Sequence, residues 1–188
     1  MAGIKEQPRA RGTIRYVLID ERTGDIVGEG QRENIITDAG ITDIAEAMAR
    51  AYGSGTPAVT NVMNVVALGR TSLSPGAPAA SNTLNNIGIG ETAGLATVDS
   101  GYPKLNATTG DDASNSTSGG ADILTWRATW AAGTYDYADI DDVAITESGA
   151  AIPASGQSIL NHSDGLAIDK SGGNKTLRLW VNISITRP

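Results

Sequence analysis

The sequence has no cysteine and no phenylalanine, a single histidine, and only 4% aromatic residues. Without cysteine there is no disulfide framework, no thiolate metal site and no cysteine nucleophile. With His162 as the one imidazole, a histidine-rich metal cluster is excluded, and a serine–histidine–aspartate mechanism has only that residue for its base. The sequence therefore offers none of these sites, and we expect neither a cofactor nor a bound metal.

Long apolar runs and a basic overall charge are also missing. No run approaches the roughly 18 apolar residues of a membrane span, and the N-terminal MAGIKEQPRARG lacks the apolar core of a signal sequence. The net charge of −7 argues against nucleic-acid binding as the main role, because neutralising phosphates needs a basic surface. We expect a protein made in the cytoplasm that has neither nucleic acid nor a membrane as partner.

The 188 residues suit one domain, but their charge is uneven. Residues 1–15 carry four bases against one acid, a net of +3, whereas residues 91–150 carry ten acids against two bases, a net of −8. We predict a basic arm over residues 1–11, either frayed or docked on a partner, and a single domain over residues 12–188. Residues 106–120, NATTGDDASNSTSGG, have almost nothing to bury and are predicted to form an exposed, mobile loop.

Apolar and polar residues alternate in several segments, which indicates strands. The predicted strands are 12–20, 25–31, 59–69, 121–132, 140–146 and 175–186, the first two forming a hairpin and the segment 140–146 lying beside 121–132. One helix is predicted over 38–52, with Thr37 or Asp38 as its N-cap. Residues 84–99 mix glycine and isoleucine and fit no single element. The fold class is mainly β: an antiparallel β-sandwich, jelly-roll-like, with one helix in the N-terminal half.

Two polar clusters were weighed as sites. His162, Ser163 and Asp164 bring the three residue types of a catalytic triad together, but consecutive side chains in an extended segment point to different sides, so a polar loop is the preferred interpretation. The acidic run from Asp136 to Asp142 offers carboxylates for Ca²⁺, although it lacks the register of a calcium loop. An exposed acidic strand edge that discourages pairing with other chains is preferred there.

Two further patterns resemble ligand sites only superficially. The segment from Gly88 to Gly94 is glycine-rich but has neither the spacing nor the lysine of a phosphate-binding loop, and we interpret it as a turn. Trp126, Trp130 and Tyr16 form an aromatic set that a sugar-binding platform would use. Because Trp126 and Trp130 share the apolar face of the most regular strand, we expect them in the core.

Four segments follow the predicted hairpin in a recognisable order. They are ENIITDAGITDIAEAMARAYGSGT (33–56), VALG (66–69) before a Ser/Pro/Ala loop, LTWRATWAAGTYDYADIDDVAITESG (124–149), and AIDKSGGNKTLRLWVNISI (167–185). In this order most of the chain, from Gly12 to Ile185, resembles small structural proteins of tailed bacteriophages. In that group an "N-ITdaGL" segment precedes a helix, a strand ends in "ALGtG", a later strand ends in "EaG", and a lysine and a turn precede the last strand. This sequence departs from the pattern at Arg70 and in the extra polar loop at 106–120.

The resemblance implies a non-enzymatic virion protein with no catalytic residues to carry over. A capsid decoration (cement) protein that binds the head surface is the leading expectation, because a fibre module would normally continue past the last strand. A tail-fibre, baseplate or tail-adaptor protein involved in host attachment is the alternative, and a carbohydrate-binding module is the third possibility.

The chain's expected partners are copies of itself and another virion protein. Eight aromatic residues are a thin supply for a lone sandwich of 188 residues, so burial between subunits is expected, and a homotrimer suits both a capsid and a fibre. The basic arm would dock on an acidic neighbour such as the major capsid protein or a tail protein, with Lys5, Arg9 and Arg11 as the partner-binding residues.

Overall fold

The computed structural model describes residues 9–42, 63–101, 104–105, 121–147, 150 and 156–186. The strands in this part of the chain are β1 (Arg9–Asp20), β2 (Ile26–Ile36), β3 (Met63–Arg70), β4 (Leu95–Thr97), β5 (Lys104–Leu105), β6 (Ala121–Trp130), β7 (Ile140–Glu147), β8 (Asn161–His162) and β9 (Lys175–Thr186). Three short 3-10 helices accompany them: η1 (Thr71–Leu73), η2 (Leu84–Ile87) and η3 (Thr92–Gly94).

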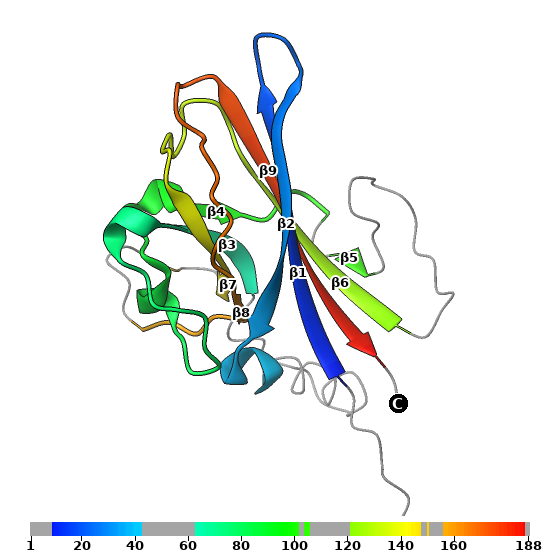
Figure 1. Cartoon of the computed structure of the whole chain (residues 1–188). Helices are drawn as coiled ribbons and strands as arrows, with labels where there is room; N and C mark the ends of the chain where they lie inside the picture. Colours follow the sequence, from blue (N-terminus) through cyan, green and yellow to red (C-terminus); the bar gives the residue numbers. More distant parts are fainter. Residues whose placement is uncertain are drawn as a thin grey trace, which may run out of the picture.

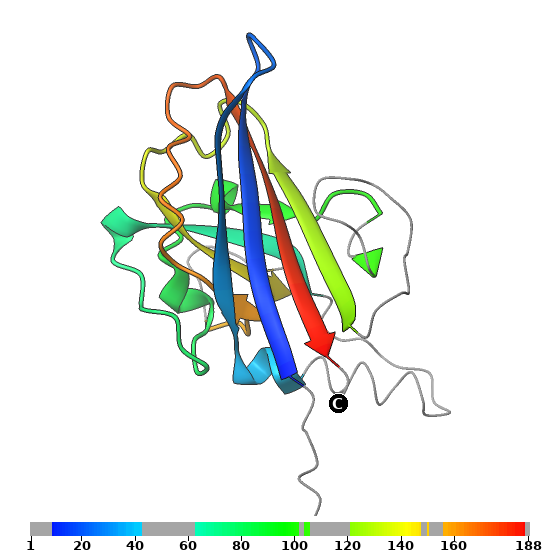
Figure 2. The same cartoon turned by 45° about the vertical axis from the view of Figure 1, so that its right-hand side comes forward.

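The strands form two antiparallel sheets (Figure 1). The larger sheet has six strands in the order β5-β6-β9-β1-β2-β8, and the smaller has three in the order β4-β3-β7. The smaller sheet lies behind the long strands of the larger one in Figure 2. The predicted mainly β, antiparallel, sandwich-like architecture is confirmed.

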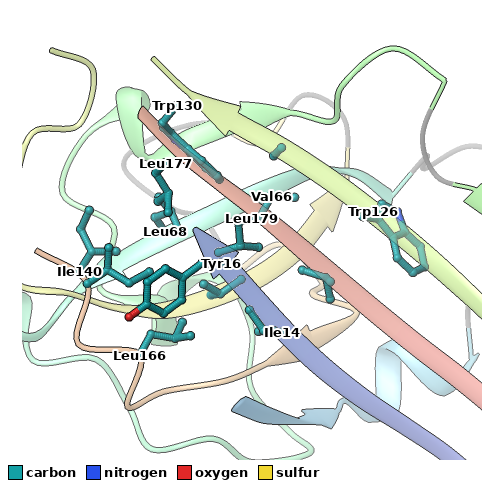
Figure 3. Close-up of a cluster of buried hydrophobic side chains, with 14 of the residues drawn as sticks. Ile14, Tyr16, Val66, Leu68, Trp126, Trp130, Ile140, Leu166, Leu177 and Leu179 are labelled. Carbon is teal, nitrogen blue, oxygen red and sulfur yellow. The ribbon is translucent and has the colours of Figure 1, made fainter. Parts of the chain in front are cut away.

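The main core lies between the two sheets (Figure 3). On β1, β6 and β9 every second side chain points inward, because side chains in a strand alternate between faces. The inward residues of these strands include Ile14, Tyr16, Leu18, Trp126, Ala128, Trp130, Leu177, Leu179, Val181 and Ile183. They pack against Val66 and Leu68 of β3 and against Val143 and Ile145 of β7. The alternation expected in the strands at 12–20, 121–132 and 175–186 is therefore confirmed.

The segment 159–168 joins the two sheets along one side. Its residues His162 and Asn161 pair with the end of β2. The same segment bridges β7 of the other sheet through Val143–Ser163, Thr146–Ile159 and Ile140–Ile168. Both sides of β7 are thus bonded, since β3 pairs with its other edge.

Three strand predictions need correction. β1 begins at Arg9 and pairs with the end of β9, so Arg9 and Arg11 belong to the sheet and not to a separate arm. Residues 9–11 have little apolar surface to bury, but their backbone hydrogen bonds to β9 are enough to place them in the strand. β2 continues to Ile36, well past the predicted end at 31. β7 was expected beside β6, but it pairs with β3 in the smaller sheet.

The predicted helix begins where expected. Thr37 is its N-cap: the hydroxyl oxygen accepts the Gly40 N–H at 3.0 Å, which satisfies a backbone donor of the first turn. The Thr37 hydroxyl also donates to the Ile159 carbonyl. The structure describes this helix from Asp38 to Thr42, and the rest of the predicted helix lies outside the described residues, as does the loop 106–120. Among described helices, none has the length and apolar character needed to cross a membrane.

Gly69 marks a close approach of β3 to the chain after η2. The Arg70 N–H donates to the Gly88 carbonyl at 3.1 Å, and a Cβ atom at Gly69 would overlap the Ile87 carbonyl oxygen. We expect Gly69→Ala to lower the free energy of unfolding by about 3 kcal/mol, because a backbone segment must move. Urea denaturation measures this. Gly76→Ala is the control, since the nearest atom to its Cβ is the flexible Asn86 amide at 3.2 Å; equal losses in both variants would contradict the account.

Candidate functional sites

His162 lies in a buried polar network that the sequence did not predict. Its Nε2 is 2.7 Å from Asp142 Oδ1, and its Nδ1 is 2.7 Å from Asn82 Nδ2. The Asn82 amide also donates to the Ala77 carbonyl at 2.8 Å, which fixes the amide orientation. His162 Nδ1 must therefore accept, and Nε2 carries the hydrogen that goes to Asp142. The network joins β7, β8 and the loop before η2.

This network holds segments together and does not present a reactive group. Asp142 and His162 are fully buried, and both imidazole nitrogens are engaged. Burial raises the pKa of the Asp142 carboxyl, while the hydrogen bond from His162 opposes that rise. The second oxygen of Asp142 is buried without a partner among the described residues. The hydrogen bond from His162 is therefore important for keeping the Asp142 carboxylate in the interior.

The predicted polar loop at 162–164 is only partly right. Asp164 is exposed, but His162 and Ser163 are buried because this segment is the strand that links the sheets. As expected, the three side chains do not bond to one another: the Ser163 hydroxyl donates to the Glu33 carbonyl at 3.0 Å, and His162 bonds to Asp142.

The acidic run does not form an exposed strand edge, because β7 is bonded on both sides. Its carboxylates accept hydrogen bonds from different parts of the chain. Asp136 accepts from the Gly173 N–H at 3.0 Å, Asp139 from the Ser72 N–H at 3.0 Å, and Asp141 from the Ala167 N–H at 2.9 Å. The described residues contain no group of three or more side chains suited to hold a metal ion. Through these hydrogen bonds the carboxylates hold neighbouring loops against β7 and against the turn before it.

The glycine-rich segment, interpreted from the sequence as a turn, is an irregular stretch that leads into the 3-10 helix η3. Gly88 ends η2 with a φ of 67°, in the left-handed region that glycine adopts easily. Gly94 lies at the end of η3, where an added Cβ would be 3.0 Å from both the Leu68 carbonyl oxygen and the Tyr135 ring. The segment lets the chain pass close to β3.

The tryptophans are core residues, as expected. Trp126 and Trp130 are 3% and 2% exposed, and their indole N–H groups donate to the carbonyls of Met63 and Ala93. A sugar-binding platform built on these two tryptophans is therefore excluded. Trp180, which no sequence pattern singles out, lies on the other face of β9, where the Arg15 guanidinium is 5.7 Å from its ring centroid.

Lys170 is buried, and no carboxylate of the described residues forms an ion pair with its amine. The ammonium donates to the carbonyls of Ala131 and Thr134 at 2.9 and 2.7 Å. Burial lowers the pKa of Lys170, and the charge of Asp136 opposes that change. Both acceptors belong to the loop between β6 and β7, so this lysine closes the loop onto the segment before β9.

Two of the three residues predicted to bind a partner, Arg9 and Arg11, lie toward one end of the larger sheet. Arg9 and Arg11 stand in β1 opposite Thr186 and Ser184, and Arg11 is exposed. Lys5 lies outside the described residues. β1 begins and β9 ends at this side of the sheet, at the bottom of Figure 1.

The hairpin turn at the opposite end is stabilised by Asp20. Its carboxylate accepts from the Arg22 N–H at 2.9 Å, from the Arg22 guanidinium at 2.8 Å and from the Asn174 amide at 2.9 Å. The Arg22 side chain, with these other donors, holds the pKa of Asp20 well below its ordinary value of 3.8.

A pH-dependent loss of stability follows from that depressed pKa. A lowered folded-state pKa contributes stability above the unfolded-state value, and this contribution is lost as the pH falls toward the folded-state value. We expect Asp20→Asn to melt at a lower temperature than the wild type at pH 7, with the gap closing as the pH drops below about 4. Calorimetry across pH measures it; a gap that stays constant would show that the charge of Asp20 is not responsible.

The outer edge of β2 has no strand beside it over most of its length among the described residues, and the sequence did not predict this. One side of β2 pairs with β1 from Ile26 to Asn34, while its other side pairs with β8 only at Ile35 and Ile36. Ile26 and Val27, near the turn, are 60% and 51% exposed. The long run 26–36 after the turn is visible in the sequence, but its two glycines favour an earlier end to the strand.

Comparison with known proteins gives no assignment. No protein family matches the chain, and neither curated proteins nor solved structures provide a match.

Proposed function

We propose that the chain is a non-enzymatic structural protein of a tailed-bacteriophage virion, and specifically a decoration (cement) protein that binds the head surface as a multimer. The proposal starts from the sequence resemblance to small phage structural proteins. It is supported by the part that the resembling residues play in the fold. Lys170, the lysine of that pattern, binds loop carbonyls in the interior, and the preceding "VALG" segment is the buried core of β3. These residues of the resemblance therefore stabilise the fold.

Virions that lack the protein test the proposal. Negative-stain imaging and mass spectrometry of such virions are expected to show bare or pressure-sensitive heads with intact tails. If the tails lose appendages and adsorption fails while the heads withstand pressure, the alternative holds, and the protein is a tail-fibre, baseplate or tail-adaptor component.

The multimer is part of this proposal. Few large aromatic side chains are available to a chain of 188 residues, so burial between subunits would add to its stability. Light scattering of the purified protein is expected to give three times the monomer mass. A monomer at all concentrations would contradict the homotrimer.

The basic residues Lys5, Arg9 and Arg11 are the proposed contact with an acidic virion protein. Deleting residues 1–11 would remove the start of β1, so a charge change is the cleaner test. Replacing the three by glutamine leaves the backbone pairing of β1 with β9 in place. We expect this variant to enter virions less efficiently with an unchanged melting temperature; unchanged incorporation would show that these charges are passive.

A further inference from the structure

Along β2, from Ile26 to Gln31, the outer edge of the larger sheet has no strand beside it among the described residues. Beyond Gln31 the edge is closed, because Arg32 Nε donates to the Gly165 carbonyl at 2.8 Å and the Ser163 hydroxyl bonds to the Glu33 carbonyl. No described strand pairs with β2 on this side before Ile35. The top of this edge lies in the β1–β2 hairpin, which projects beyond the body of the protein (Figures 1 and 2).

The direction of the backbone groups on this edge can be derived. In an antiparallel strand the N–H and C=O of one residue point to the same side, and successive residues alternate. The Glu33 carbonyl and the Thr37 N–H both bond to the segment at 160–163, so residues with odd numbers face the open edge. The register with β1 is regular from Gly28 to Asn34, hence Glu29 and Gln31 present their N–H and C=O groups there. No described residue bonds to these four backbone groups.

Several protections that natural sheets use against unwanted pairing are missing from this edge. Proteins block open edges with proline, with lysine or with a covering segment. The strand 26–36 contains no proline and no lysine. Only the register shift opposite Leu18 and Ile19 distorts it, and that lies at the hairpin end. The edge is therefore competent to bind another strand through its backbone.

The inward side of the edge offers an apolar contact. Gly28 and Gly30 have no side chains, and Leu18 and Tyr16 reach across them: an added Cβ would be 3.1 Å from Leu18 Cδ1 and 2.6 Å from Tyr16 Cε1. An inward-facing apolar side chain of an added strand would thus lie beside the Tyr16 ring, which belongs to the main core.

The outward side of the edge is acidic. Glu29 and Glu33 are exposed, and Gln31 lies between them. Arg15 of the neighbouring strand forms an ion pair with Glu29 at 3.9 Å, and Glu33 and Gln31 complete the row. A second copy paired through the same edge would place two such acidic rows side by side, which is unfavourable for like charges across strands. Basic side chains on the incoming strand would complement the row.

We propose that Ile26–Gln31 binds an extended segment of a different protein as an added antiparallel strand, with basic side chains outward beside Glu29 and Glu33 and apolar side chains inward beside Tyr16. Antiparallel addition continues the pairing of the whole sheet. This inference does not depend on the virion assignment, since it uses only the geometry and charge of β2.

A short peptide of alternating lysine and valine, acetylated and amidated, is the probe. Fluorescence anisotropy with the full chain measures its affinity. In antiparallel pairing the lysines lie opposite Glu29 and Gln31, so their N–H groups make the bonds to β2. Methylating the lysine backbone nitrogens is expected to abolish binding, whereas methylating the valine nitrogens leaves it. Equal effects of the two modifications would overturn the proposed strand addition.

Two protein variants complete the test. Gln31→Pro removes an N–H that faces the open edge without removing a bond to β1, and Gln31→Ala is its matched control. We expect the proline variant to bind the peptide about tenfold more weakly, the effect of one lost hydrogen bond, and the alanine variant to bind within about twofold of the wild type. Circular dichroism checks that both are folded; equal peptide affinity in the two folded variants would contradict the proposal.

The same measurements distinguish a second copy of this chain from a segment of a different protein at the β2 edge. If the protein dimerises without peptide and Gln31→Pro abolishes the dimer, a second copy occupies the edge and the proposal of a different protein is overturned. A peptide with glutamate in place of lysine is expected not to bind; binding as tight as the lysine peptide would refute the charge complementarity.

Discussion

Replacing His162 by leucine is expected to lower the free energy of unfolding by about 3–5 kcal/mol, because it leaves the Asp142 carboxylate buried without its hydrogen-bond donor. Asp142 is fully buried, and its other oxygen already has no described partner. Equilibrium urea denaturation at pH 7 measures the loss.

The double variant Asp142→Leu/His162→Leu is the control. A buried pair replaced as a whole by apolar residues is often close to neutral, so we expect the double variant to recover most of the loss. If the single and the double variant lose the same free energy of unfolding, His162 stabilises the fold through its volume and not through its hydrogen bond to the Asp142 carboxylate.

The loss of stability in the His162→Leu variant is expected to depend on pH. Burial already raises the pKa of Asp142, and removing the hydrogen bond from His162 raises it further. A folded-state pKa above the unfolded one penalises folding when the carboxyl is charged, and this penalty disappears as the pH falls. The stability deficit of the variant should therefore be smaller at about pH 5 than at pH 7.

Replacing Trp130 by alanine is the second large effect, with an expected loss of about 3–5 kcal/mol. Trp130 is among the largest fully buried side chains, and it faces the smaller sheet in the core (Figure 3). Removing it leaves a cavity and also frees the Ala93 carbonyl, which accepts the indole N–H at 3.2 Å.

Trp130→Phe is the matched control, since it keeps an aromatic ring in the core and loses only part of the volume and the N–H. We expect a loss of about 1–2 kcal/mol for it by the same denaturation measurement. A loss as small for alanine as for phenylalanine would show that the core collapses around the site, and that Trp130 does not fix the spacing of the sheets.

The strands that could be predicted are those whose pattern is local. The alternation in 12–20, 121–132 and 175–186 places one set of side chains inward, and the structure buries those sets. The helix cap was predicted at Thr37 or Asp38, both of them residue types that accept a hydrogen bond from the first turn, and the structure places it at Thr37. The buried tryptophans followed from the same alternation.

What could not be predicted depends on contacts between distant segments. The sheet to which β7 belongs is decided by its pairing with β3 and with residues 159–168, and strand pairing leaves no mark in a single sequence. The partners of His162 lie 20 residues away at Asp142 and 80 away at Asn82. The open edge of β2 likewise depends on which strands fail to reach it.

The location of the protein in the particle tests the central proposal most directly. Heads and tails can be separated from purified virions, and quantitative mass spectrometry of each fraction counts this chain against the major capsid protein. We predict that the chain is found with the heads, in a fixed ratio to the capsid protein. Recovery with the tails, or absence from both fractions, would contradict a capsid decoration protein.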